Sequence, residues 1–223
     1  MTGTMKVVAI DGPAGAGKST VASGVARALG WRYLDTGALY RSVALAALGR
    51  DVDLADGAAL GRLVRSLDLD LSDGRVRVDG RDVTEAIRAH EITEAVSTVA
   101  AHPEVRAALL ERQRHEAESG EVVIEGRDIG SRVVPGAGVK VWLTASLEER
   151  ARRRAADLDL SPEDAQRVGL EGSIRDRDEA DSNREASPFR RSPDAATVDS
   201  TGRPIDEVVA EIVRLARERF HGG

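Results

Sequence analysis

The sequence contains no cysteine, and only 3% of its 223 residues are aromatic. The absence of cysteine excludes disulfide bonds and thiolate metal sites, and it is typical of proteins in a reducing compartment. Because aromatic side chains are scarce, the core must consist mainly of Val, Leu, Ile and Ala. For the same reason we do not expect platforms on which the bases of single-stranded nucleic acid would stack.

The chain also lacks an excess of positive charge and any long hydrophobic run. Its formal net charge is −6, whereas non-specific binding to a duplex requires a basic surface, so we expect no nucleic acid partner. The segment MTGTMKVVAI, residues 1–10, has an apolar run too short for a signal peptide or a membrane span. No long exposed apolar stripe is evident. We therefore expect a cytoplasmic monomer that does not contact a membrane.

Lysine is rare too, and the chain has only Lys6, Lys18 and Lys140. Lys18 stands in DGPAGAGKST, residues 11–20, between an apolar run and a helical pattern. The histidines are scattered without the spacing of metal ligands, and we assign them no function; they are His90, His102, His115 and His221.

Short apolar runs alternate with helical patterns along much of the chain. Strands are predicted at residues 6–10, 31–35, 122–126, 139–145 and 196–200. Helices are predicted at residues 18–29, 38–48, 146–156 and 205–219. This alternation predicts an α/β fold in which a parallel sheet is flanked by helices on both faces.

Two segments interrupt this alternation. Within residues 51–100, RVRVDGRDV at 75–83 has the alternation and the Asp-Gly turn of a β-hairpin, which predicts an inserted subdomain. Residues 150–184 are dense in charge. Such a run is usually a solvated face, and its simplest interpretation is a solvated pair of helices.

The stretch from Gly12 to Ser19 matches the P-loop pattern, in which a glycine, four residues and Gly-Lys-Ser stand between a strand and a helix. Glycines let backbone N–H groups turn inward around phosphate oxygens, and the N-terminus of the following helix adds partial positive charge. Lys18 is predicted to reach the β- and γ-phosphates of ATP, and the Ser19 hydroxyl to bind Mg²⁺. The predicted ATP-binding residues are Gly12, Pro13, Ala14, Gly15, Ala16, Gly17, Lys18, Ser19 and Thr20.

A P-loop alone predicts nucleotide binding, and several classes of protein share it. A GTPase would carry an Asn-Lys-x-Asp motif after a strand, and the three lysines exclude it. A motor ATPase would have a hydrophobic strand that ends in Asp, whereas VVIEG offers only Glu125. A kinase of a small acceptor remains.

An acceptor that is itself a nucleoside monophosphate needs a second set of phosphate donors. Arg suits this role, because it binds phosphate oxygens in a bidentate fashion that Lys cannot. The candidate arginines are Arg41, Arg106, Arg127, Arg177 and Arg184. Carboxylates such as Asp128 and Asp181 would suit sugar hydroxyls or the amino group of a base.

Five segments of the chain point to one family. They are IDGPAGAGKST, LDTGALYR, AAHPEVRAALLERQR, EGRDIGSRVVPGAGVKVWLTAS and RDRDEADSNREASP. Their order and approximate spacing resemble those of the bacterial cytidylate kinases, which are CMP/dCMP kinases of the nucleoside monophosphate kinase class. The first segment is shared with many kinases, whereas DTGALYR together with EGRDIG is quite specific. The resemblance runs from about residue 5 to residue 220.

The resemblance implies a role for each matching residue on the acceptor side. Ser97 would read the cytosine, and Arg106 and Asp128 would contact the base. Arg127 would hold the acceptor phosphate, and Asp181 would lie at the ribose. The full set of implied substrate-binding residues is Thr36, Arg41, Ser97, Arg106, Arg127, Asp128, Arg177 and Asp181.

The resemblance also implies catalytic roles and a division of the chain. Besides Lys18 and Arg127, Arg177 would lie near the phosphates and Arg184 would act on the transferring phosphate. The fold would be that of a P-loop nucleoside monophosphate kinase, a single domain over residues 1–223. Its parts would be a core (about 1–36, 104–149 and 185–223), an inserted monophosphate-binding subdomain (about 37–103) and a short lid (about 150–184).

Two details of the lid follow from the same resemblance. Its phosphate-clamping arginine is expected among Arg152, Arg153 and Arg154, and the pattern does not select one. Ala180 and Ser182 stand where some relatives carry further arginines, so the lid is less basic here.

The implied function is transfer of the γ-phosphate of ATP to CMP or dCMP with Mg²⁺. A phosphate monoester is already ionised near pH 7, since its second pKa is about 6, so no strong general base is required. Two alternatives stay open at this point: a P-loop kinase of another acceptor (adenylate, uridylate, shikimate or a sugar acid), and a module that binds ATP without transferring phosphate. A purely structural protein is disfavoured, because core packing does not call for Lys18 and Ser19 in that loop.

Overall fold

A computed structural model describes residues 5–72, 74–183 and 189–221. The chain forms two compact units, Met1–Tyr33 with Ala117–Gly223 and Leu34–Glu116, which we call unit 1 and unit 2.

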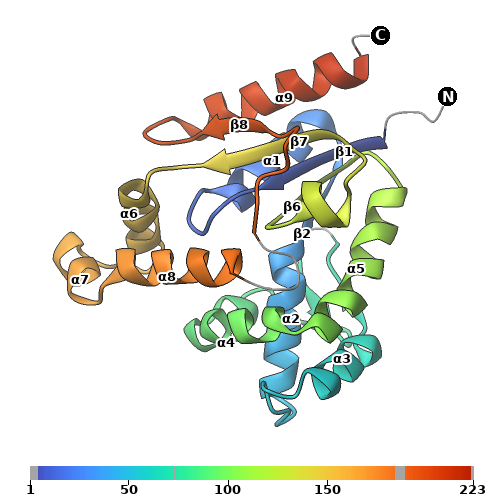
Figure 1. The fold of residues 1–223 in the computed structure, drawn as a ribbon, viewed down its shortest axis with the longest axis vertical. Coiled ribbons are helices and arrows are strands. Elements are labelled where there is room, and N and C mark those ends of the chain that lie inside the picture. The colour runs from blue at the N-terminus through green and yellow to red at the C-terminus, as the bar shows by residue number, and fades with distance from the viewer. Residues whose placement is uncertain (1–4, 73, 184–188, 222–223) are drawn as a thin grey trace. The chain divides into compact units, whose positions relative to one another are not determined.

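Unit 1 is built around a parallel sheet with the strand order β2-β6-β1-β7-β8 (Figure 1). The strands are β1 Met5–Asp11, β2 Arg32–Asp35, whose last two residues belong to unit 2, β6 Val122–Gly126, β7 Ala137–Thr144 and β8 Ala196–Asp199. Strand β1 pairs in parallel with β6 on one side and with β7 on the other, and β7 pairs in parallel with β8. The predicted α/β fold with a parallel sheet is confirmed.

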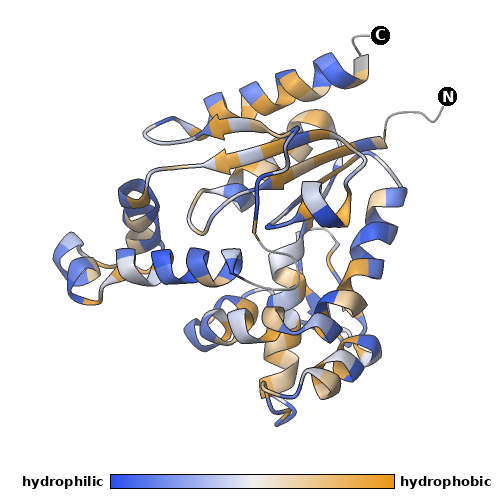
Figure 2. Ribbon diagram, viewed as in Figure 1, coloured by the Kyte–Doolittle hydropathy of each residue, from blue (hydrophilic) through white to orange (hydrophobic). Residues whose placement is uncertain are grey.

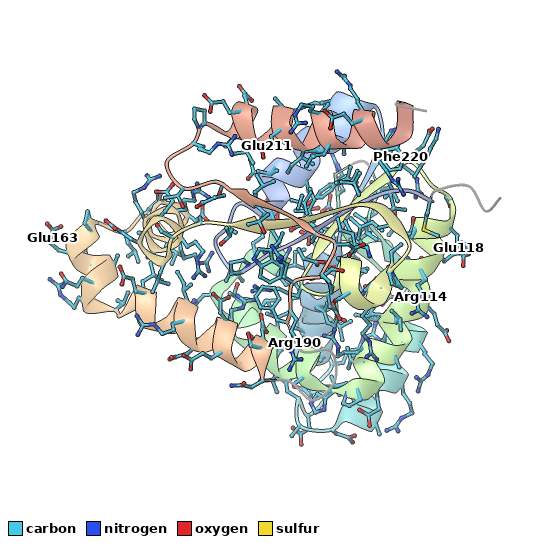
Figure 3. The ribbon with its side chains drawn as sticks, turned by 45° about the horizontal axis from the view of Figure 1, so that its top comes forward. Arg114, Glu118, Glu163, Arg190, Glu211 and Phe220 are labelled. Carbon is cyan, nitrogen blue, oxygen red and sulfur yellow. The ribbon has the colours of Figure 1, made fainter. Side chains whose placement is uncertain are left out.

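Helices α1 (Lys18–Leu29) and α9 (Ile205–His221) pack together on one face of this sheet (Figure 1). Their buried side chains join those of the strands in one apolar core; from the helices these are Val21, Ala22, Val25, Ala26, Val208, Ile212, Val213 and Ala216. Figure 2 shows the resulting alternation of apolar and polar residues along α9. Near its end, Phe220, labelled in Figure 3, lies 5.2 Å from the Trp31 ring, centroid to centroid.

The charged segment of unit 1 contains three helices instead of the predicted pair. They are α6 Leu147–Asp157, α7 Pro162–Arg167 and α8 Leu170–Ser182. The extra helix, α7, begins at a local signal: the Ser161 hydroxyl accepts a hydrogen bond from the amide of Asp164, and Pro162 occupies the first helical position. Glu163 of α7 is exposed and points away from the rest of unit 1 (Figure 3).

Unit 2 is mainly helical around its own apolar core. Its elements are α2 Thr36–Leu48, α3 Gly57–Ser66, β3 Leu69–Asp70, β4 Arg77–Val78, β5 Arg81–Asp82, the 3₁₀ turn η1 Ala86–Arg88, α4 His90–Ala101 and α5 Pro103–Glu118, whose last residues belong to unit 1. The largest fully buried side chains of its core include Leu39, Leu60, Ile92 and Leu109.

The predicted hairpin of unit 2 is confirmed. Strands β4 and β5 pair in antiparallel fashion across the two residues Asp79 and Gly80, whose φ angles are 50° and 76°. Positive φ at both central residues matches the type I′ turn, and its twist suits a two-residue hairpin. Strand β3 adds to β4 and completes a small three-stranded sheet.

Within the described part of the chain, no helix is both long enough and apolar enough to cross a membrane.

Candidate functional site

The P-loop of unit 1 joins the end of β1 at Asp11 to the start of α1 at Lys18. Gly15 and Gly17 have φ angles of 75° and 85°, in the left-handed region that favours glycine. At Gly12, a Cβ atom would overlap the backbone carbonyl oxygen of Leu143 on β7. The glycines therefore allow both the turn of the loop and its close packing on the sheet, directly before the N-terminus of α1.

Lys18 follows this loop as the first residue of α1. Its ammonium donates a hydrogen bond to the carbonyl oxygen of Pro13 at 2.9 Å. The pKa of Lys18 is lowered from 10.5 to about 7, mainly because the ammonium is removed from water. The neighbouring guanidinium of Arg127 is the next largest cause. An anion bound in the loop would favour the charged form of the lysine, so phosphate binding and protonation of Lys18 are coupled.

Asp11, the last residue of β1, connects the start of the loop to the segment after β6. Its carboxylate accepts hydrogen bonds from the amides of Ile129 and Gly130, both at 2.8 Å. These amides open η2, a π-helical turn (Ile129–Val133) that follows β6. Burial raises the pKa of Asp11 from 3.8 to about 6, and the two amides counteract part of that shift.

Arg127 lies between the P-loop and α8. Its guanidinium donates to the carbonyl oxygen of Gly12 at 3.0 Å and forms an ion pair with Asp181 at 3.1 Å. The guanidinium carbon also lies 5.0 Å from the centroid of the Phe189 ring, which stacks on Trp142. Arg127 is thus fixed by hydrogen bonds and by an aromatic face, as a positioned cation needs to be.

Two arginines of α6 contact the P-loop backbone directly. Arg150 donates to the carbonyl oxygen of Ala14 at 3.1 Å. Arg153 donates to the carbonyl oxygen of Ala16 at 3.2 Å and to that of Ser200 at 2.7 Å. These contacts give the charged segment an inward face against the loop, which a wholly solvated pair of helices would not have.

The arginines predicted as candidate clamps of the lid differ in their surroundings. Arg152 pairs with Glu149, and its side chain is 69% exposed, whereas that of Arg153 is 24% exposed. Only Arg153 of these two reaches the P-loop.

Two predicted residues of the acceptor side, Thr36 and Arg41, stand in the first turns of α2 in unit 2. The carboxylate of Asp35 caps this helix by accepting from the amide of Ala38, and it also accepts from Arg41 at 2.8 Å. Thr36, the first residue of α2, is buried. Arg41 therefore has a fixed direction, set by a residue that directly precedes the helix.

A second guanidinium of unit 2 is buried. Arg106 on α5 is 6% exposed, lies 5.7 Å from the Tyr40 ring centroid and donates to the carbonyl oxygen of Ala100 at 3.4 Å. Ser97 is half-buried on α4. A buried arginine is uncommon without a binding role or strong partners, so Arg106 stands apart from the surface arginines.

The predicted site residues thus fall into two sets. Unit 1 holds the P-loop residues with Arg127, Asp128, Arg177 and Asp181, and unit 2 holds Thr36, Arg41, Ser97 and Arg106. Asp128 and Asp181 are buried, and Arg177 is half-buried on α8 and close enough to lower the pKa of Lys18. Arg184 lies outside the described residues.

Three residues at the loop were not among the sequence candidates: Asp11, Arg150 and Asp178. Asp178 on α8 accepts hydrogen bonds from the Ala14 amide and from two arginines. The sequence offered one signal for Asp178: it follows the apolar Ile174 at helical spacing, as does Asp181. In the structure Ile174 is the single buried apolar residue of α8, and it marks the inward face of this helix.

Among the residues that the structure describes, no group of three or more His, Asp or Glu side chains is arranged to hold a metal ion.

Comparison with known proteins agrees with this geometry. The family described as cytidylate kinase matches residues 8–218. The cytidylate kinase of Exiguobacterium sibiricum is 49% identical over 213 residues, which cover 94% of this chain and 96% of that protein. That of Shouchella clausii is 48% identical over 217 residues, which cover 95% and 96%.

A solved structure of a gluconokinase from Sinorhizobium meliloti covers 99% of this chain and 98% of its own, with 16% identity and a TM-score of 0.51. At that identity the likeness concerns the fold alone. The sequence matches confirm the resemblance predicted from the motifs, and with it the enzyme class, an ATP-dependent phosphotransferase. The chain belongs to the cytidylate kinase family.

Proposed function

We propose that this enzyme transfers the γ-phosphate of ATP to CMP or dCMP, giving ADP and CDP or dCDP. The observation that carries the proposal is the P-loop lysine beside a fixed arginine, in a chain of the cytidylate kinase family: Lys18 has its pKa lowered to about 7 by removal from water and by Arg127. The positive charges of Lys18 and Arg127 repel each other, and a polyanion bound between them would remove this repulsion. The triphosphate of ATP is such a polyanion.

The donor side consists of the loop amides, Lys18 and the nearby arginines. The loop amides and the N-terminus of α1 bind the phosphates, and Lys18 neutralises charge on the β- and γ-phosphates. Arg127, Arg177 and Arg184 complete the predicted catalytic set. In such a reaction the protein mainly aligns two anions and stabilises the charge of the transition state.

The residues proposed for the acceptor side are Thr36, Arg41, Ser97 and Arg106 in unit 2, and Arg127, Asp128, Arg177 and Asp181 in unit 1. Arg127 holds the phosphate of CMP, and Thr36 and Arg41 bind elsewhere on the CMP side. Ser97, Arg106 and Asp128 recognise the cytosine, and Asp181 binds the ribose. Because the acceptor phosphate is already ionised at neutral pH, no side chain has to remove a proton from it.

Mg²⁺ is the expected metal, and the donor chemistry at the loop fits it. Mg²⁺ prefers oxygen ligands and is usually bound through one or two protein groups together with substrate phosphates and water. Ser19, exposed at the second position of α1, offers such a hydroxyl oxygen. When bound with ATP, the ion neutralises charge on the β- and γ-phosphates.

The larger-scale assignments are also part of this proposal. Residues 37–103 form the monophosphate-binding insert, residues 150–184 the lid, and the remainder the core of one kinase domain. The enzyme works as a cytoplasmic monomer on small-molecule substrates.

The choice of acceptor is tested by measuring ADP release from MgATP with CMP, dCMP, UMP and AMP in turn. We expect turnover with CMP and dCMP well above that with UMP and AMP. Ser97→Ala should reduce the ratio of turnover with CMP to turnover with UMP by more than it reduces turnover with CMP itself, because a residue that recognises the base determines selectivity. Turnover mainly with AMP or UMP would contradict the assignment of Ser97, Arg106 and Asp128.

A further inference from the structure

The Asp178 carboxylate sits on the P-loop itself. One of its oxygens accepts hydrogen bonds from the Ala14 amide at 3.1 Å and from Arg127 at 3.4 Å. The other oxygen accepts from Arg150 in a short ion pair. The Asp178 side chain is only 17% exposed, so this is an enclosed contact between α8 and the loop.

The donors around Asp178 are those that a phosphate group uses. P-loop amides and forked guanidinium groups are the standard ligands of phosphate oxygens, and a carboxylate shares the charge and acceptor geometry that they select. The carboxylate also neutralises Arg150 and adds to the ion pair that Asp181 makes with Arg127; both arginines lie against the loop backbone.

In the part of the chain that the structure describes, one hydrogen-bond donor of the arginines around Asp178 lacks an acceptor. The Nε of Arg150 is buried and has no hydrogen-bond partner among the described residues. A buried donor without an acceptor is costly, so this guanidinium can accommodate a further oxygen. Lys18 meanwhile donates to the Pro13 carbonyl. The loop and its arginines thus retain donor capacity beyond what Asp178 takes up.

We propose that Asp178 is a placeholder for a phosphate group: its carboxylate occupies the Ala14 amide and holds Arg127 and Arg150 at the loop until the phosphates of the nucleotide displace it. This rests on the proposed function, because it takes the loop as the phosphate site. Asp178 is a positioning residue here, since it acts through the two arginines and the loop amide. It keeps them in place without nucleotide, and it competes with phosphate binding.

The position of Asp178 on α8 offers a matched control. Asp176, two residues earlier, is exposed on the same helix. Asp176→Asn and Asp178→Asn remove the same charge from the same element. Only the second removes it from the loop, so a difference between the two variants reports the local contact and not the net charge of the lid.

The test is calorimetric titration of pyrophosphate, without CMP, into the wild type, Asp178→Asn and Asp176→Asn. The asparagine keeps the shape and one acceptor oxygen but loses the competing charge, so we expect about 3- to 30-fold tighter binding in Asp178→Asn. Asp176→Asn should stay within about twofold of the wild type. Equal or weaker binding in Asp178→Asn would overturn the proposal.

The same titration separates this proposal from the one on which it rests. If the wild type binds pyrophosphate and Asp178→Asn binds it no better, the placeholder is refuted while the phosphate site stands. If pyrophosphate binds to neither, the loop is not a phosphate site and both proposals fail.

A second measurement on the wild-type chain covers the case in which Asp178→Asn does not fold. With ¹³C-labelled aspartate, and Asp178→Glu used for assignment, the carboxyl signal of Asp178 should move towards that of an exposed aspartate as pyrophosphate saturates the enzyme. A carboxyl signal that stays unchanged at saturation would show that Asp178 remains on the loop, and would refute the exchange.

Discussion

At the scale of single residues, the loop contains two ionisable groups whose pKa values are shifted towards neutrality. The pKa of Lys18 is lowered to about 7, and that of Asp11 is raised to about 6, in both cases mainly by removal from water. The amides of Ile129 and Gly130 hold Asp11 in place, whereas Lys18 has a carbonyl oxygen as its partner. Lys18 is therefore the group that responds to an added anion.

This asymmetry predicts proton uptake when nucleotide binds. At pH 8 most Lys18 side chains of the free enzyme are neutral, because this pH lies above their pKa of about 7. Bound phosphates favour the ammonium, so binding of ADP should take up close to one proton at pH 8 and little at pH 6. Calorimetry in buffers of different ionisation enthalpy measures this number. Uptake that persists in Lys18→Met would assign the proton to another group.

Residue roles were predictable where a motif fixes them and not elsewhere. The glycines and Lys18 follow from the P-loop pattern, because its chemistry requires these residues at these positions. Arg150 and Asp178 stand in residues 150–184, where 17 of 35 positions are charged, so charge alone did not separate inward from outward side chains. Ile174 was the one local marker of the buried face of α8.

At the scale of elements, the loop depends on close packing between β1 and β7. The strands were predictable because a buried parallel strand is a continuous apolar run, as in VVAI of β1. The π-helical turn η2 was not predictable. Its amides are held by Asp11, which lies 118 and 119 residues earlier in the chain, and a local pattern carries no sign of such a contact.

Gly12 tests this packing. Gly12→Ala would force a methyl group into the carbonyl oxygen of Leu143, so we expect the free energy of unfolding to fall by about 3 kcal/mol and ADP binding to be lost. Gly136→Ala is the control, because its Cβ would meet no atom within 4 Å and should change stability by less than about 0.5 kcal/mol. Urea denaturation measures both. Equal stability of the two variants would contradict the packing argument.

The contact of α6 with the loop predicts a difference between neighbouring arginines. Arg153→Ala removes hydrogen bonds to the carbonyl oxygens of Ala16 and Ser200, so ADP should bind about tenfold more weakly. Arg152→Ala removes an exposed pair with Glu149 and should leave ADP binding within about twofold. Titration of ADP into both variants decides this. A similar loss in both would mean that general lid charge, and not the Arg153 contact, supports the loop.

At the scale of the whole molecule, the chain passes between the two units at residues 33–34 and again at 116–117. Each unit has its own apolar core, and each holds part of the predicted site. The sequence predicted the inserted segment from its hairpin. The family resemblance, and not any local pattern, supplied the roles of Arg41, Ser97 and Arg106, because a local pattern does not relate residues so far apart in the sequence.

Water competes with CMP for the γ-phosphate of ATP, so we expect substrate binding to order both the lid and the insert and thereby exclude water. A two-substrate analogue should slow amide hydrogen exchange in residues 150–183 and in residues 37–103, measured by mass spectrometry. ADP alone should slow exchange mainly around the P-loop. Exchange that is unchanged by the analogue in both segments would contradict the predicted closure.

The formation of CDP is the most direct measurement of phosphate transfer from ATP to CMP. Chromatography of a reaction with MgATP and CMP should show CDP and ADP appearing in equal amounts with the wild type. The same should hold for the control Lys6→Ala, whose lysine is exposed and pairs with Glu121. Lys18→Ala should abolish both products. ADP without CDP, or CDP formation that survives Lys18→Ala, would contradict the account.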